Sequence, residues 1–161
     1  MTDKDWQQRL DALWAEFDQH EPDDFVGKIE SLTAGLPPGD AVALFERASA
    51  NDSVGREQQA APLYRQALAA GLAGQLRRRA TIQLASTLRN LGQADESIAL
   101  LTAEQQAGSD ELDDAVTAFL ALSLVDTGRE REAVALALTA LARHLPRYNR
   151  SLAGYAGALI Q

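Results

Sequence analysis

Two histidines and several acidic residues are the side chains of this sequence that could bind a metal ion or transfer a proton. His20 is followed closely by Glu21, Asp23 and Asp24, whereas His144 is isolated. A metal site needs several histidine or carboxylate ligands at matched helical spacing, and one histidine in an acidic segment does not provide them. We therefore expect an acidic surface loop at His20 and no metal site.

The other pairs of carboxylates have a structural explanation. Asp95–Glu96 and Asp113–Asp114 fall near the predicted starts of helices, where negative charge is stabilised by the helix dipole. The sequence contains no phosphate-binding loop, dinucleotide fingerprint or nucleophile elbow. We therefore expect no enzyme activity and no cofactor.

Net charge argues against nucleic acid as a partner. The chain has a formal charge of −8, and its only basic run, Arg77–Arg79, has no interleaved aromatic residues. The first 40 residues carry ten acidic and three basic side chains, so nearly all of the net negative charge lies there. The remaining basic residues are all arginine, which suits fixed contacts with carboxylates, although the codon preference of a GC-rich genome is the simpler explanation.

The fold is indicated by a repeated helical pattern. Residues 77–101 predict two amphipathic helices joined at Gly92, because apolar residues recur at spacings of three and four on both sides of it. The same pattern recurs around Gly128, 36 residues later, and more weakly around Gly55, 37 residues earlier. A period of this length with one helical hairpin per unit is typical of an all-α helical solenoid. We expect about nine helices and buried leucines at Leu84, Leu88, Leu101, Leu120 and Leu124.

The N-terminal segment carries an apolar stripe of Trp6, Leu10, Leu13, Trp14 and Phe17. We expect the helices 3–19 and 23–34 to cover the first repeat as a cap; the alternative is that the stripe forms a two-fold dimer. We interpret residues 1–161 as a single domain, with a helical pair at 1–36, three repeats at 40–145 and a capping helix at 148–161. The expected helices of the repeats are 40–52, 57–70, two within 75–107, 110–126 and 130–144.

The three units resemble tetratricopeptide repeats (TPRs). The second unit matches the family pattern through Leu84, Ala85, Leu88 and Gly92, and the third through Leu120, Ala121, Leu124, Gly128, Ala133, Ala137 and Ala140. The first matches at Ala48, Gly55, Ala60, Tyr64 and Ala67, but Arg47 and Asn51 stand where large apolar residues are expected. The run STLRNLG, with RYNR downstream, also resembles small stand-alone bacterial TPR proteins that have no assigned activity.

The resemblance implies a protein–protein interaction module that binds a peptide or protein segment in a concave groove. The family's groove positions fall here on Phe45, Ser49, Asp52, Arg79, Ile82, Ser86, Arg89, Asn90, Ala118, Leu122, Val125 and Asp126. Arg79, Arg89 and Asn90 suggest a ligand with an acidic or C-terminal carboxylate group. The basic residues of the TPR chaperone clamp are absent. The alternative is a structural module that self-associates and fills its own groove or apolar ends.

Composition limits where in the cell this protein is expected and whether it binds a membrane. The most apolar run, residues 115–125, is too short to cross a bilayer, which needs about 20 apolar residues. The absence of cysteine is compatible with a reducing cytoplasm, and the first residues lack the layout of a signal peptide. We expect a cytoplasmic monomer or homodimer without a membrane partner.

Overall fold

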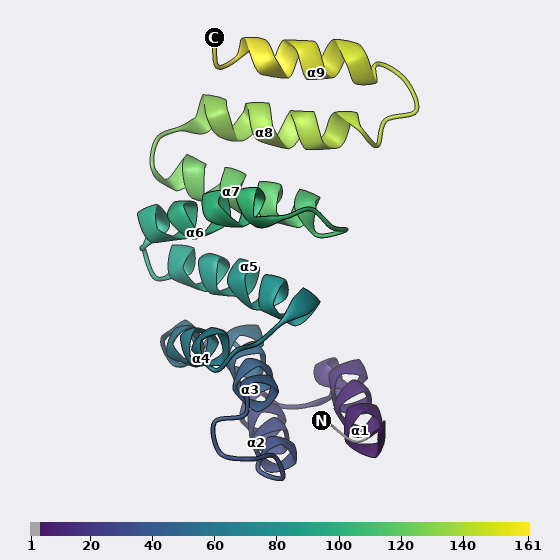
Figure 1. Cartoon of the computed structure of the whole chain (residues 1–161), viewed down its shortest axis with the longest axis vertical. Coiled ribbons are helices and arrows are strands. Elements are labelled where there is room, and N and C mark those ends of the chain that lie inside the picture. The colour runs from purple at the N-terminus through teal and green to yellow at the C-terminus, as the bar shows by residue number, and fades with distance from the viewer. Residues whose placement is uncertain (1–3) are drawn as a thin grey trace. The chain divides into compact units, whose positions relative to one another are not determined.

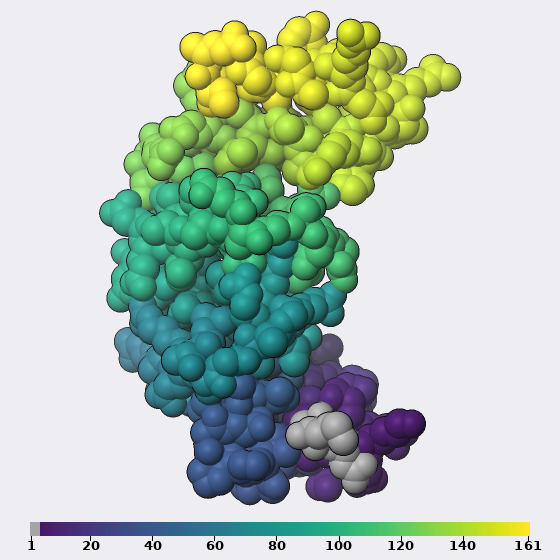
Figure 2. Space-filling model, viewed as in Figure 1, coloured from purple at the N-terminus to yellow at the C-terminus, as the bar shows by residue number. Residues whose placement is uncertain are grey.

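The computed structural model of this chain describes residues 4–161. In that range it contains nine α-helices, one 3₁₀ helix and no strand, so the predicted all-α fold of stacked helical hairpins is confirmed (Figure 1). Side chains fill most of the space that separates the ribbons (Figure 2). The elements are α1 (Lys4–Ala15), the 3₁₀ helix η1 (Phe17–Gln19), α2 (Pro22–Thr33), α3 (Ala41–Ser53), α4 (Glu57–Ala69), α5 (Gly74–Asn90), α6 (Ala94–Ala107), α7 (Asp113–Asp126), α8 (Glu130–Ala142) and α9 (Asn149–Ala158).

The turn within each predicted repeat has one geometry. Gly55, Gly92 and Gly128 have φ angles of 75°, 79° and 75°, in the left-handed region that side-chain-bearing residues rarely adopt. In each case the amide after the glycine donates a hydrogen bond to a carbonyl five residues earlier, at 2.8–2.9 Å. This bond closes the last turn of the first helix and starts the second helix in the antiparallel direction. The glycine spacing therefore predicts the hairpins because it locates their turns.

The chain divides into two compact units, residues up to Ala80 and residues from Thr81 to Gln161, with the boundary inside α5. In the first unit, α1 and α2 pack together and α2 packs on α3 around Trp6, Phe25, Ile29 and Ala50. The Trp6 indole N–H donates to the carbonyl oxygen of Leu32 at 3.1 Å. These contacts bury the tryptophan without leaving its N–H unpaired.

Two polar contacts join the N-terminal helices to α3. The Trp14 indole N–H donates to Glu46 Oε2 at 2.8 Å, and Arg47 Nε donates to Thr33 Oγ1 at 2.7 Å. Arg47 is one of the two residues that depart from the repeat pattern. The departure coincides with a contact to α2, which is not a repeat helix.

The second unit contains its own core, formed where α6, α7 and α8 pack in succession. Ile82, Leu101, Leu120 and Leu124 are among its buried side chains. A hydroxyl pair crosses this core, since Ser97 Oγ on α6 and Ser123 Oγ on α7 lie 2.8 Å apart. The five leucines predicted to be buried, Leu84, Leu88, Leu101, Leu120 and Leu124, are each at most 4% exposed.

Two predicted helix boundaries need correction. The first helix was expected to run from 3 to 19; it ends at Ala15, a 3₁₀ turn follows, and Asp3 lies outside the described residues. The helix expected at 110–126 begins at Asp113. Its start is displaced because Asp113 Oδ1 accepts from the Asp110 amide at 3.1 Å and Asp110 Oδ1 accepts from the Leu112 amide at 2.8 Å. These two side-chain bonds hold residues 110–112 in a turn.

Candidate functional site

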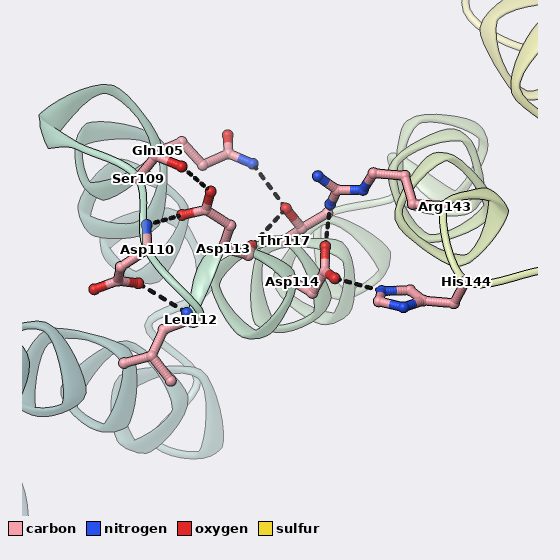
Figure 3. Close-up of polar contacts among 9 residues, drawn as sticks. All are labelled: Gln105, Ser109, Asp110, Leu112, Asp113, Asp114, Thr117, Arg143 and His144. Carbon is pink, nitrogen blue, oxygen red and sulfur yellow. Dashed lines mark hydrogen bonds and ion pairs between the residues drawn. The ribbon is translucent and has the colours of Figure 1, made fainter.

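The two histidines lie in ion-pair clusters. His20 Nδ1 is 3.1 Å from Lys28 Nζ, and its ring stacks on Phe25. His144 Nε2 is 2.7 Å from Asp114 Oδ2, and the other oxygen of Asp114 accepts from Arg143 (Figure 3). Within residues 4–161, no group of three or more histidine and acidic side chains is arranged to hold a metal ion.

The structure buries three of the residues assigned to the groove. Phe45, Ser49 and Ile82 are 0%, 3% and 6% exposed. The Tyr64 hydroxyl lies 3.4 Å from Ser49 Oγ and donates to Asp52 Oδ2 at 3.2 Å. Ser49 and Asp52 are thereby tied to the adjacent helix α4. The buried side chains of Phe45, Ser49 and Ile82 offer a partner no surface, whereas Asp52 is partly exposed.

Arg79 is exposed and packs on the first repeat. Its guanidinium lies 5.3 Å from the centroid of the Phe45 ring, within the range of a cation–π contact. Its charge also acts on Glu46, a buried carboxyl on α3. Burial raises the pKa of Glu46, while the Trp14 hydrogen bond and the charge of Arg79 act in the opposite direction. Arg79 is therefore part of the local packing as well as a possible ligand contact.

Arg89 is already paired within the second unit. Its Nε lies 2.6 Å from Asp126 Oδ2 and its Nη2 donates to Asp126 Oδ1 at 3.2 Å. Both residues were assigned to the groove, one on α5 and the other 37 residues later at the end of α7. This ion pair balances the charge of Arg89 with that of Asp126 and links the last turns of the two helices. The neighbouring Asn90 remains exposed and Ser86 is half-buried.

An exposed apolar row remains on α7. Ala118, Leu122 and Val125 follow one another at spacings of four and three, and all three are exposed. Leu122 and Val125 are 45% and 46% exposed, although their neighbours Leu120, Ala121 and Leu124 are buried. We call Ala118, Leu122 and Val125 the α7 strip. It ends beside Asp126, the partner of Arg89.

The sequence analysis did not identify the ion-pair cluster that joins α7 to the end of α8. Asp114 binds both Arg143 and His144, and Thr117, one turn along α7, accepts from Gln105 of α6 at 3.3 Å (Figure 3). The sequence contained only an indirect signal, an acidic pair at one helix start and a basic pair at the next helix end. Residues separated by about 30 positions cannot be matched without knowing how the helices are stacked.

Comparisons with known proteins agree with the repeat architecture. A family model described as "Tetratrico peptide repeat" matches residues 41–159, from α3 through α9. A solved structure described as "Crystal structure of MamA protein" shares the fold at a TM-score of 0.64 and 19% identity, over 86% of this chain and 73% of that chain. No curated protein matches the sequence. Every helix in residues 4–161 is too short or too polar to cross a bilayer.

The family model covers residues 41–159, which is more than half of the chain. The chain therefore belongs to the tetratricopeptide repeat family, whose helical hairpins serve as protein–protein interaction modules.

Proposed function

We propose that this protein binds a segment of a partner protein on the surface formed by α7 and the end of α5, with the α7 strip as its apolar centre. The observation that carries the proposal is the exposure of Leu122 and Val125 on one face of a helix whose opposite face is core. Apolar side chains in a row at helical spacing complement an amphipathic helix or an extended segment with apolar side chains.

The apolar contacts would supply the main binding energy at this surface. Full burial of an aliphatic side chain contributes about 1.5–3 kcal/mol, so half-exposed Leu122 and Val125 would contribute about 1 kcal/mol each. The Arg89–Asp126 pair leaves the end of the strip close to neutral. Asn90, exposed beside it, offers both a donor and an acceptor to a partner's backbone. Orientation of the bound segment would thus come from Asn90 and the ion pair.

The proposal is tested by comparing two matched double variants in partner capture. Leu122→Gln/Val125→Gln changes the α7 strip, whereas Val134→Gln/Leu141→Gln changes residues of the same two types on α8, which are 45% and 49% exposed. Glutamine is a good helix former, so both variants should keep the fold. We expect the first variant to lose the proteins that wild type captures from the native host, and the second to retain them. Equal capture by all three would contradict the proposal.

A second candidate function is self-association through the end of the chain. Tyr148, Tyr155 and Ile160 are 76%, 74% and 58% exposed, which makes them the most exposed large apolar side chains in the described residues. A solenoid end normally has a polar outer face. Sedimentation analysis of wild type and Tyr155→Lys tests this candidate. A dimer that dissociates in the variant would support it, and a monomeric wild type would exclude it.

A further inference from the structure

A pocket of about 540 Å³ lies between the second half of α8 and its neighbours α7 and α9. Thr117 of α7 lies on one side, Arg150 and Ala153 of α9 on another, and Leu136, Ala140 and Ala142 of α8 form the base. The space exists partly because Ala140, Ala142 and Ala153 leave it unfilled. A volume of this size is within the range of pockets that hold small ligands or one to two residues of a peptide.

Hydrogen bonds at both ends of α9 hold this pocket open. At the first, the Asn149 side-chain amide donates to the carbonyl oxygens of Ala142 and Leu145, each at 2.6 Å. At the second, Arg131 Nε on α8 donates to the carbonyl oxygen of Leu159 at 3.0 Å. Two attachments far apart fix the separation of α8 and α9, so the pocket is part of the folded structure.

The polar groups that line the pocket are satisfied, with one exception. Thr117 and Thr139 donate to carbonyl oxygens of their own helices at 3.0 and 2.7 Å, and Arg143 donates to Asp114 (Figure 3). Arg150 has no hydrogen-bond or ion-pair partner within residues 4–161. Its guanidinium carries five donors and a permanent charge. Arg150 is exposed to solvent, so the lining offers one cation without a partner among the described residues, beside an apolar base.

The charge around the pocket favours an anion. Arg143 and Arg150 line it and no acidic residue does; Arg143 is paired with Asp114, so Arg150 supplies the charge that no group of the described chain balances. Residues 127–161 contain five arginines against two glutamates, in a chain whose net charge is −8. An anionic group is therefore attracted to this end of the molecule, and it gains a charge-assisted, potentially two-point hydrogen bond at Arg150.

We propose that this pocket binds the C-terminal residue of a partner peptide, with its α-carboxylate on Arg150 and an aliphatic side chain against Leu136 and Ala140. A C-terminal residue carries a carboxylate and a side chain on the same carbon, which matches a cation next to an apolar base in a single small pocket. An internal acidic residue presents its carboxylate on one side chain and an apolar group on another. The site is separate from the α7 strip, because Thr117 and Leu122 point about 140° apart around α7.

The test is a titration of the full chain with acetyl-Ala-Ala-Leu as the free acid and as the C-terminal amide, followed by NMR of the backbone amides. The acid should shift resonances of residues 136–153, and the amide should bind at least about tenfold more weakly because it lacks the charge. Arg150→Gln should weaken binding of the free-acid peptide by a similar factor. Arg147→Gln is the matched control, since Arg147 is an exposed arginine of the same segment that does not line the pocket.

Two further variants separate the outcomes. Ala153→Leu fills the pocket and should abolish binding of the acid while the circular dichroism spectrum stays unchanged. Leu122→Gln/Val125→Gln should leave tripeptide binding intact, so failure of the α7 strip as a partner site is distinguishable from failure of the pocket. Equal binding of acid and amide, full binding by Arg150→Gln, or no shift with the acid at low salt would each overturn the proposal.

Discussion

Leu101 is the residue whose truncation best tests the packing of the second unit. It lies on α6, is 0% exposed and belongs to the core that includes Leu120 and Leu124 of α7. Leu101→Ala removes three carbon atoms, each worth about 0.8 kcal/mol of transfer free energy, or about 2.4 kcal/mol together. A residual cavity adds to this loss and brings the expected range to roughly 2–5 kcal/mol.

The assay for Leu101→Ala is urea unfolding followed by circular dichroism in the far ultraviolet. Leu122→Ala serves as the matched control, because it is the same substitution on the neighbouring helix at a side chain that is 45% exposed. We expect Leu122→Ala to cost less than about 1 kcal/mol, as surface substitutions usually do. Equal losses for the two variants, or a loss well below 1 kcal/mol for Leu101→Ala, would refute the assignment of the buried helix faces.

Three further predictions concern charge and backbone. Burial raises the pKa of Glu46, so the folded state binds the carboxyl proton more tightly than the unfolded state does. As the pH rises above the ordinary glutamate pKa, wild type should therefore lose stability relative to Glu46→Gln. Urea unfolding at a series of pH values measures this difference. In urea unfolding, Gly128→Ala should cost about 1–2 kcal/mol because φ is 75° there. Gly154→Ala inside α9 should instead gain about 0.5–1 kcal/mol in the same assay. Arg89→Gln should cost only about 0.2–1 kcal/mol, since its ion pair is partly exposed, and a larger loss would indicate a core role.

The sequence predicts the fold well because its strongest signals are local. Glycine at Gly92 and Gly128 is required by a left-handed turn, and that turn reverses the chain wherever it occurs. Leu88 and Leu124 precede these glycines and lie at helical spacing from other apolar residues of the same helices. Their burial can therefore be inferred without knowledge of the neighbouring helices. The start of α7 was displaced from its predicted position because side-chain bonds around Asp113 compete with helical hydrogen bonds.

The candidate sites are less predictable because they depend on contacts between distant residues. Repeat register assigns Phe45 and Ile82 to the groove, but tertiary packing buries both. It also assigns Arg89 and Asp126 separately, and only the stacking of α5 and α7 brings them into one ion pair. The pocket at Arg150 depends on how α9 is held against α8, which no helical pattern encodes.

The position of the indole rings has a spectroscopic consequence. Both tryptophans of the chain, Trp6 and Trp14, are packed in the first unit, and the second unit contains none. Selective excitation of indole therefore monitors only the residues before Thr81, whereas far-ultraviolet dichroism averages over every helix. Coincident midpoints would mean that the units unfold as one cooperative block, and separated midpoints would mean that each melts alone. The native chain thus carries a site-specific optical reporter of inter-repeat cooperativity, without any label.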